Sequence, residues 1–115
     1  MGIPEAYKAA ILAAHEDHTR VTQAFSGRPA RGIVNRFMSE MDARQDVVLA
    51  FPLQNSHTRP LRAAAAKQGK AEFLSLWAGQ GVRLARRQSA QELIARLAME
   101  IEETLAALGQ ASPVL

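Results

Sequence analysis

The stretch Phe25-Ser26-Gly27-Arg28-Pro29-Ala30-Arg31-Gly32 places two glycines, a proline, a serine and two arginines within eight residues. Glycine allows backbone angles that other residues avoid, and proline suits the first turn of a helix. Apolar residues at helical spacing follow, namely Ile33, Val34, Phe37, Met38 and Met41. The stretch therefore predicts a positively charged turn at a helix N-terminus, where an anion could bind. The alternative is an ordinary loop with solvated or paired arginines.

The composition favours a single helix-rich domain. The chain has 115 residues, of which 48% are hydrophobic and only six are aromatic, and alanine supplies much of the apolar content. It contains no cysteine, which excludes disulfides, thiolate catalysis and cysteine-ligated metals. No apolar run is long enough to span a bilayer and the N-terminus lacks the features of a secretory signal, so we expect a cytoplasmic location.

The basic residues give a weak indication of nucleic-acid binding. The net charge is only +3, and acidic residues are scattered among the basic ones. One segment, between Asp17 and Glu40, contains no acid, and its arginines could contact a few phosphates. These arginines are Arg20, Arg28, Arg31 and Arg36. Because no aromatic residues alternate with them to stack on bases, we do not expect nucleic acid to be a partner.

Four to five helices and one or two short strands are expected. Helices are predicted from Pro4 to about residue 15, from Ala30 to Arg44, and in a short segment with Phe73, Leu76 and Trp77 on one side. The β-branched residues of 19–25 predict a short strand, and the apolar run 47–51 predicts a buried strand or buried coil.

Prolines divide the middle of the chain. The segment between Pro52 and Pro60 is not expected to form one uninterrupted helix with the residues after it. Instead, Thr58 is predicted to cap a helix that ends near Gly69.

The final helix is the clearest structural prediction. Ser89 and Glu92 have the spacing of a capping box, and Gly109 is expected to end the helix. One continuous apolar stripe runs between these ends, made of Leu93, Ile94, Leu97, Ile101, Leu105 and Leu108. We therefore expect one domain over residues 1–109, followed by a loose tail over 110–115.

The residues alone do not compose a recognisable active site. His15 and His18 are three positions apart and could supply two metal ligands, but His57 is distant in the sequence, and a polar helix terminus explains the pair equally well. The sequence has no nucleophile elbow, Rossmann fingerprint or P-loop. The turn Ala78-Gly79-Gln80-Gly81 allows something to approach the backbone closely.

Several motifs together resemble the C-terminal part of the nitronate monooxygenase family, formerly called 2-nitropropane dioxygenases. The motifs occur in the family's order and roughly its spacing, and extend from about Pro4 to Leu108. They are Ala6-Tyr7-Lys8-Ala9-Ala10, Thr22 through Gly32, Asn35-Arg36-Phe37, Phe51-Pro52-Leu53-Gln54-Asn55, Arg59 through Ala65, and Trp77-Ala78-Gly79-Gln80-Gly81.

The resemblance implies an FMN-dependent enzyme that oxidises nitronates with molecular oxygen. Such enzymes fold as a (β/α)8 barrel with a helix-rich second domain over the flavin, and this chain resembles that second domain plus the closing barrel helix. The family's phosphate loops and catalytic histidine lie on the barrel and match nothing here. We therefore assign no catalytic residue, no metal ligand and no complete flavin site, and name only Trp77 and Gln80 as candidates near the flavin cleft.

Two hypotheses remain for the chain alone. In the first, it is a C-terminal fragment of such an enzyme, inactive and without FMN by itself, whose partner is the missing barrel portion. In the second, it is a non-catalytic helical module that acts through self-association or partner binding, using apolar helix faces that a barrel would otherwise cover. In both, the run from Ser26 to Gly32 is expected to fix the architecture of the domain rather than to hold a ligand.

Overall fold

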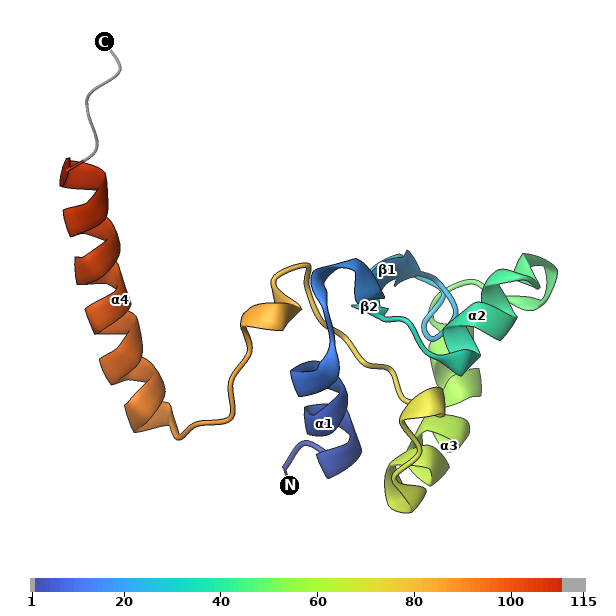
Figure 1. Cartoon of the computed structure of the whole chain (residues 1–115). Helices are drawn as coiled ribbons and strands as arrows, with labels where there is room; N and C mark the ends of the chain where they lie inside the picture. Colours follow the sequence, from blue (N-terminus) through green and yellow to red (C-terminus); the bar gives the residue numbers. More distant parts are fainter. Residues whose placement is uncertain (1, 111–115) are drawn as a thin grey trace, which may run out of the picture. The chain divides into compact units, whose positions relative to one another are not determined.

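A computed structural model describes residues 2–110 and is mainly helical (Figure 1). Within these residues, short 3-10 turns connect four α-helices and two strands, as the sequence predicted. The helices are α1 (Glu5–Ala13), α2 (Arg36–Asp42), α3 (Leu53–Gln68) and α4 (Ala90–Gln110), and the strands are β1 (Thr19–Thr22) and β2 (Ala30–Ile33). Internal contacts divide the chain into two compact units, residues 1–85 and 86–115, which are described separately. The single domain expected over residues 1–109 stays a prediction.

The glycine- and arginine-rich stretch forms the tip and second strand of a β-hairpin. β1 and β2 pair in antiparallel register from Thr19 opposite Ile33 to Thr22 opposite Ala30. In the connecting loop, Gly27 has φ = 87° and donates its backbone N–H to the carbonyl of Gln23 at 2.9 Å. The prediction of a shaped turn is correct, because the loop needs a backbone angle that suits glycine.

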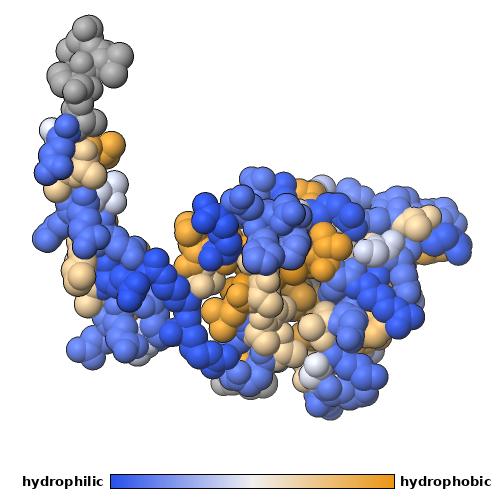
Figure 2. Space-filling view, viewed as in Figure 1, coloured by the Kyte–Doolittle hydropathy of each residue, from blue (hydrophilic) through white to orange (hydrophobic). Residues whose placement is uncertain are grey.

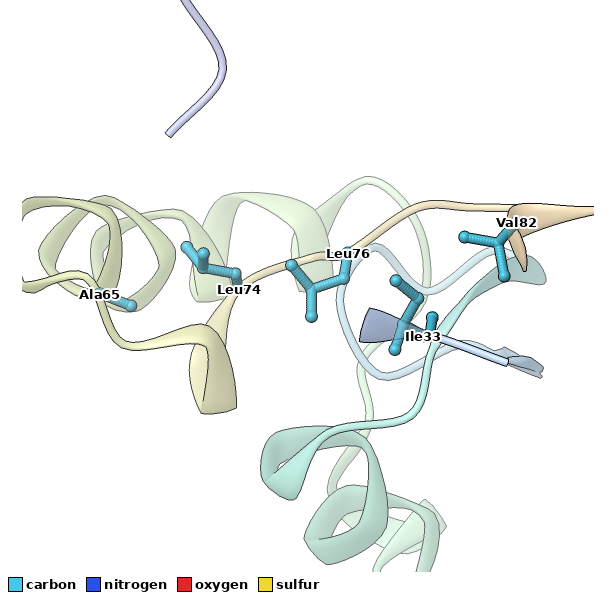
Figure 3. Close-up of a cluster of buried hydrophobic side chains, with 6 residues drawn as sticks. Ile33, Ala65, Leu74, Leu76 and Val82 are labelled. Carbon is cyan, nitrogen blue, oxygen red and sulfur yellow. The ribbon is translucent and has the colours of Figure 1, made fainter. Parts of the chain in front are cut away.

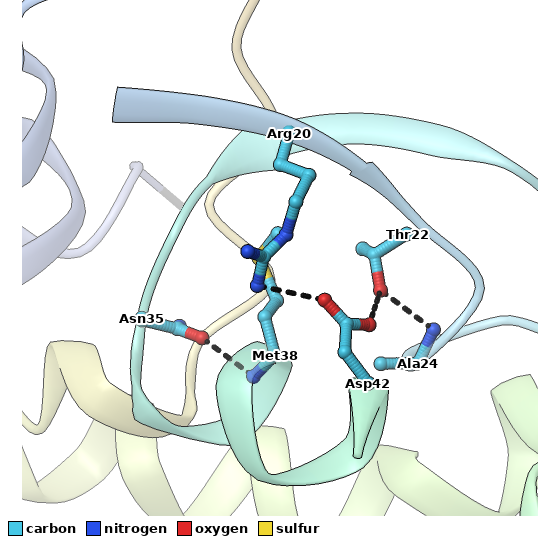
Figure 4. A network of polar contacts seen from close by, with 6 residues as sticks. All are labelled: Arg20, Thr22, Ala24, Asn35, Met38 and Asp42. Atoms are coloured by element: carbon cyan, nitrogen blue, oxygen red, sulfur yellow. Dashed lines mark hydrogen bonds and ion pairs between the residues drawn. The ribbon is translucent and has the colours of Figure 1, made fainter. Parts of the chain in front are cut away.

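The prediction that a helix begins at Ala30 is wrong. Residues 30–33 pair with β1 instead, and α2 starts at Arg36 because Asn35 caps it. The Asn35 side-chain oxygen accepts from the backbone N–H of Met38 at 3.1 Å (Figure 4). Its amide nitrogen donates to the carbonyls of Ala71 and Leu74. One side chain thus begins the helix and joins it to a distant segment.

The expected break between Pro52 and Pro60 is also wrong. α3 runs without interruption from Leu53 to Gln68 with Pro60 inside it, so Thr58 lies within the helix and is not its N-cap. Proline removes one helical hydrogen bond, but both halves of α3 are held by the rest of the unit: Gln54 and Thr58, before Pro60, bond to the hairpin loop, and Ala65, after it, is buried in the core. The predicted end is correct, since Gly69 takes a left-handed conformation with φ = 65°.

The core of the first unit lies between α1, β2, α3 and the segment after α3 (Figure 3). Its buried members are Ala14, Ile33, Ala65, Leu74, Leu76 and Val82. The helix expected around Phe73, Leu76 and Trp77 is only a 3-10 turn over Ala71–Phe73, because the following residues extend to pair with β2. The run 47–51 is neither a strand nor buried: Val47, Leu49 and Phe51 are exposed.

The second unit contains α4, whose start is correctly predicted. The backbone N–H of Ser89 donates to the Glu92 carboxylate at 2.7 Å, and the backbone N–H of Glu92 donates to the Ser89 hydroxyl at 3.2 Å. These bonds hold the pKa of Glu92 below its usual value. Gly109 does not stop the helix, since it keeps a helical backbone and α4 continues to Gln110. The rest of the expected tail lies outside the described residues.

Candidate functional site

Trp77 lies in a short extended segment that adds to the hairpin. It forms an isolated antiparallel bridge with Gly32. On either side of this bridge, the N–H of Ile33 donates to the carbonyl of Leu76 at 2.8 Å, and the N–H of Ala78 donates to the carbonyl of Arg31 at 3.2 Å. The edge of β2 therefore fixes the start of the turn that contains the candidate residues.

The half-buried Trp77 also has a clear structural role. Its ring meets that of Phe25 edge to face at 5.4 Å between centroids, and its carbonyl accepts from the Tyr7 hydroxyl at 2.6 Å. Burial raises the pKa of Tyr7, so this hydroxyl remains a donor at neutral pH. Contacts within the chain thus explain the position of Trp77 without a ligand.

Gln80 differs from Trp77 because it is exposed on the turn, next to Gly79 and the exposed Gly81. A Cβ added to Gly79 or Gly81 would have no heavy atom within 4 Å. Neither glycine has a positive φ, so neither packing nor backbone strain within residues 2–110 requires glycine there. The turn therefore leaves room for another molecule or chain segment to approach its backbone.

The four arginines considered for anion binding do not converge. Arg20 pairs with Asp42 at 2.7 Å (Figure 4), and Arg36 pairs with Glu40 at 2.7 Å. Arg28 lies over the ring of Phe51, with 4.0 Å from guanidinium carbon to ring centroid. Arg31 donates to the Thr19 hydroxyl and carbonyl on the facing strand. Each arginine has its own partner within the chain, which supports the structural interpretation of the run from Ser26 to Gly32.

The histidines do not gather into a metal site in the part of the chain that the structure describes. His15 and His18 contact each other, with ring centroids 5.0 Å apart, and the Nδ1 atom of His18 accepts from the backbone N–H of His15. His57 lies on α3, away from this pair in the sequence. Across residues 2–110, no group of three or more His, Cys, Asp or Glu residues could hold a metal ion.

Sequence reasoning missed the polar residues of α3. The amide of Gln54 donates to the Ala24 carbonyl at 2.7 Å, and its side-chain oxygen accepts from the N–H of Leu49 at 3.0 Å. The Thr58 hydroxyl donates to the Phe25 carbonyl at 2.6 Å. Both side chains are buried, and their four-residue spacing places them on one helix face. That spacing could have revealed the shared face from the sequence. The predicted helix start at Thr58 placed Gln54 outside the helix, so the spacing was not recognised.

Two hollows in the first unit lie apart from the candidate residues. A groove of ≈ 360 Å³ runs between α2 and α3, with Phe37, Val47 and Leu61 on its walls. A shallower hollow of ≈ 270 Å³ lies beside Asn35 and Leu76. Neither includes Trp77 or Gln80. The groove contains both His57 and Thr58, but the Thr58 hydroxyl already donates to the Phe25 carbonyl at 2.6 Å, so it does not serve as a nucleophile there.

The described residues do not fit FMN as a complete site. A flavin phosphate needs several convergent donors, whereas the four arginines above are held apart by separate partners. What the chain offers is one open turn, Gly79 to Gly81, next to the anchored Trp77. We therefore derive no catalytic step through a flavin from this chain.

Within residues 2–110, no helix is both long and apolar enough to cross a membrane.

Comparisons with known proteins agree on one family. The model of the family described as nitronate monooxygenase matches residues 1–100. A probable nitronate monooxygenase of Staphylococcus saprophyticus is 38% identical over 104 residues, or 90% of this chain and 29% of that protein. One from Bacillus subtilis is 41% identical over 95 residues, or 82% of this chain and 27% of that protein.

The structure of a nitroalkane oxidase from Streptomyces ansochromogenes superposes with a TM-score of 0.83 at 45% sequence identity. The match covers 93% of this chain and 30% of that one. The chain thus spans about three tenths of the length of the relatives it matches. The motifs quoted from the sequence, the fold and these matches lead to one conclusion: the chain belongs to the nitronate monooxygenase family.

Proposed function

We propose that this chain is the helix-rich second domain of an FMN-dependent nitronate monooxygenase, an oxidoreductase that oxidises alkyl nitronates or nitroalkanes with molecular oxygen. The observation that carries the proposal is the match to about three tenths of each relative, together with a fold that lacks a complete site of its own within residues 2–110. In this role the chain does not hold FMN or turn over substrate alone, and its partner is the barrel portion of the enzyme. The cytoplasmic location expected from the sequence belongs to the same proposal.

The open turn is the part of this domain that we assign to the flavin side of the cleft. Trp77 is anchored by the β2 edge and by Tyr7, so it can hold the turn in place. Gln80 is exposed and has no described hydrogen bond within residues 2–110, so its amide is available to a neighbouring group. Glycines on both sides allow close approach.

A chimera tests whether this chain can serve as the second domain of an active enzyme. The segment of the Streptomyces nitroalkane oxidase that matches this chain is replaced by residues 1–108 of this chain, and nitroalkane oxidation is assayed. We expect a folded chimera that oxidises nitroalkanes, and a Gln80→Ala version with a lower rate and the same unfolding midpoint. A folded chimera without activity would contradict the proposed domain role. Equal rates with and without Gln80→Ala would contradict the assignment of Gln80 to the cleft.

A flavin-binding experiment tests whether the chain alone holds FMN. FMN is mixed with the purified chain, and flavin absorbance is followed through gel filtration. We expect protein and flavin to elute separately, because the described residues provide no phosphate cradle. Stoichiometric co-elution would overturn this part of the proposal.

The exposed stripe of α4 favours a second candidate function, a non-catalytic module that self-associates. No residue of α4 is buried, and hydrophobic residues lie along it among hydrophilic ones (Figure 2). Leu97, Ile101 and Leu105 are 44%, 57% and 63% exposed. Because such stripes favour association, sedimentation over a range of concentrations distinguishes the candidates. A concentration-dependent dimer abolished by Ile101→Lys but not by Glu102→Lys supports the module, whereas a folded monomer at all concentrations contradicts it.

A further inference from the structure

The groove between α2 and α3 is formed where one face of each helix meets the other. Phe37 and Met41 lie four residues apart on α2, and the residues that α3 contributes have the spacing of a single helix face. These α3 residues are Gln54, His57, Thr58 and Leu61, and Val47 from the 3-10 turn before α3 completes the lining. At ≈ 360 Å³ the groove is large enough for a small molecule, since such sites occupy about 300–1,000 Å³.

The floor of the groove is fixed by the rest of the first unit. Gln54 and Thr58 are buried, and their polar groups already bond to the hairpin loop and to the segment before α3. The half-buried ring of Phe37 packs against that of Phe25, with 4.8 Å between their centroids. The groove is therefore preformed, so a ligand would order little of the chain when it binds.

The more exposed lining residues combine apolar surface with one polar group. Val47 and Leu61 are 44% and 39% exposed, so a molecule in the groove would remove their apolar surface from water. His57 is also exposed, and its ring has no described hydrogen bond or ion pair within residues 2–110. A neutral imidazole offers one donor and one acceptor. The lining thus suits a molecule with an apolar body and one hydrogen-bonding group.

We propose that this groove binds a small molecule of two fused aromatic rings whose single hydrogen-bonding group contacts His57. A cavity of about 150 Å³ holds one benzene ring, so the larger groove has room for a second ring. An aromatic body is favoured over an alkyl one because the Phe37 ring and the Met41 thioether both line the groove and both contact aromatic rings favourably. Neither Trp77 nor Gln80 lines the groove, so the site does not depend on the proposed flavin role.

An NMR titration of the chain with indole tests the proposal. The backbone amide signals of the ¹⁵N-labelled chain are assigned and followed as indole is added. We expect saturable shifts concentrated at Phe37, Met41 and Leu61, and an affinity for cyclohexanol lower by more than about tenfold. No saturable shift at these residues, or saturation confined to the apolar stripe of α4, would overturn the proposal.

A second ligand and a substitution test the role of His57. N-methylindole has no N–H to donate, so it should bind the unmodified chain about 3- to 10-fold more weakly than indole. His57→Leu keeps the bulk of the side chain without its polar atoms, and it should remove this difference by weakening only the binding of indole. An undiminished preference for indole in His57→Leu would contradict the assignment of His57.

Substitutions of exposed lining residues test the position of the site. Val47→Phe places a larger side chain in the groove and should lower the affinity for indole by more than about tenfold. Leu49→Phe is the matched control, because Leu49 is also 44% exposed but does not line the groove, and it should change the affinity by less than about twofold. Leu61→Ala removes part of one wall and should lower the affinity about 3- to 10-fold. Unchanged affinity in both Val47→Phe and Leu61→Ala would overturn the proposed position.

Discussion

The two glycine-bearing turns of the first unit look alike in sequence and differ in what holds them. A Cβ added to Gly27 would lie 2.6 Å from the backbone nitrogen of Phe51, and one added to Gly32, in the strand β2 that follows the turn, would lie 3.0 Å from the carbonyl oxygen of Leu76. At Gly79 and Gly81 the same atom would meet nothing within 4 Å. The first turn needs its glycines to pack this chain, whereas the second turn does not.

The space around each glycine distinguishes a turn that the fold requires from a turn that another molecule could contact, even though no ligand is bound. Glycine lowers the stability of a fold because it increases the conformational entropy of the unfolded chain. Where neither packing nor backbone angle requires glycine, its presence needs an explanation other than the fold. The turn from Gly79 to Gly81 is such a position, and the proposed cleft provides that explanation. Substitutions in and around the two turns test the contrast, and they differ in their expected effect on the free energy of unfolding.

Gly27→Ala is expected to have the largest effect. A residue other than glycine at φ = 87° is strained by about 1–2 kcal/mol, and the contact with Phe51 adds overpacking of about 1–3 kcal/mol. We expect a loss of about 3 kcal/mol in urea unfolding followed by circular dichroism. Gly69→Ala is the matched control, because Gly69 also has a positive φ but open space around its Cβ. If both variants lose the same amount, the close approach at Gly27 contributes nothing.

Thr58→Val is expected to come second. It removes the buried hydroxyl that donates to the Phe25 carbonyl at 2.6 Å and leaves that carbonyl without its partner, at a cost of about 2 kcal/mol. Thr58→Ser retains the hydroxyl and should lose clearly less in the same unfolding assay. A larger loss for the serine variant would show that the methyl group, and not the hydrogen bond, anchors the first turn.

Gly32→Ala is expected to lose about 1 kcal/mol. The new Cβ would lie 3.0 Å from the Leu76 carbonyl oxygen and 3.3 Å from the Cε3 atom of Trp77, so the ring or the bridge must shift by a few tenths of an ångström. Because the chain has a single tryptophan, its fluorescence spectrum reports the shift directly. An unchanged spectrum together with unchanged stability would show that the bridge is looser than its geometry indicates.

The double substitution Gly79→Ala, Gly81→Ala is expected to have the smallest effect, within about 0.5 kcal/mol in either direction. The backbone angles of Gly81, φ = −83° and ψ = 14°, are open to alanine. In the chimera, the same substitution should lower the nitroalkane oxidation rate without lowering the unfolding midpoint. A large loss of stability in the isolated chain would remove the contrast between the turns.

Local signals in the sequence predicted much of the fold. The α4 cap, the Gly69 end and the β1 strand depend on residues close together in the chain, so spacing alone revealed them. The errors arose where distant partners decide the outcome. β2 forms because β1 and Trp77 lie on its two sides. α3 continues through Pro60 because Gln54 and Thr58 fix the helix to the hairpin before the proline and Ala65 packs in the core after it.

The candidate site was less predictable than the fold. The residues alone pointed to the Gly79–Gly81 turn as open backbone, and the family resemblance supplied Trp77 and Gln80. Spacing could not show that Tyr7 and Phe25 anchor Trp77, because Tyr7 is 70 positions from it. Nor could spacing show that faces of α2 and α3 meet in a groove, since that depends on how the two helices pack.

The bridge between Gly32 and Trp77 has a consequence for the newly synthesised chain. Until residue 78 has left the ribosome, the N–H of Ile33 and the carbonyl of Arg31 lack the partners that they have in the finished fold. An unpaired strand edge is a template for wrong pairing, so this edge is exposed while some forty further residues are being translated. A pause in translation before residue 78 has emerged from the ribosome should therefore increase aggregation, and a pause after its emergence should not.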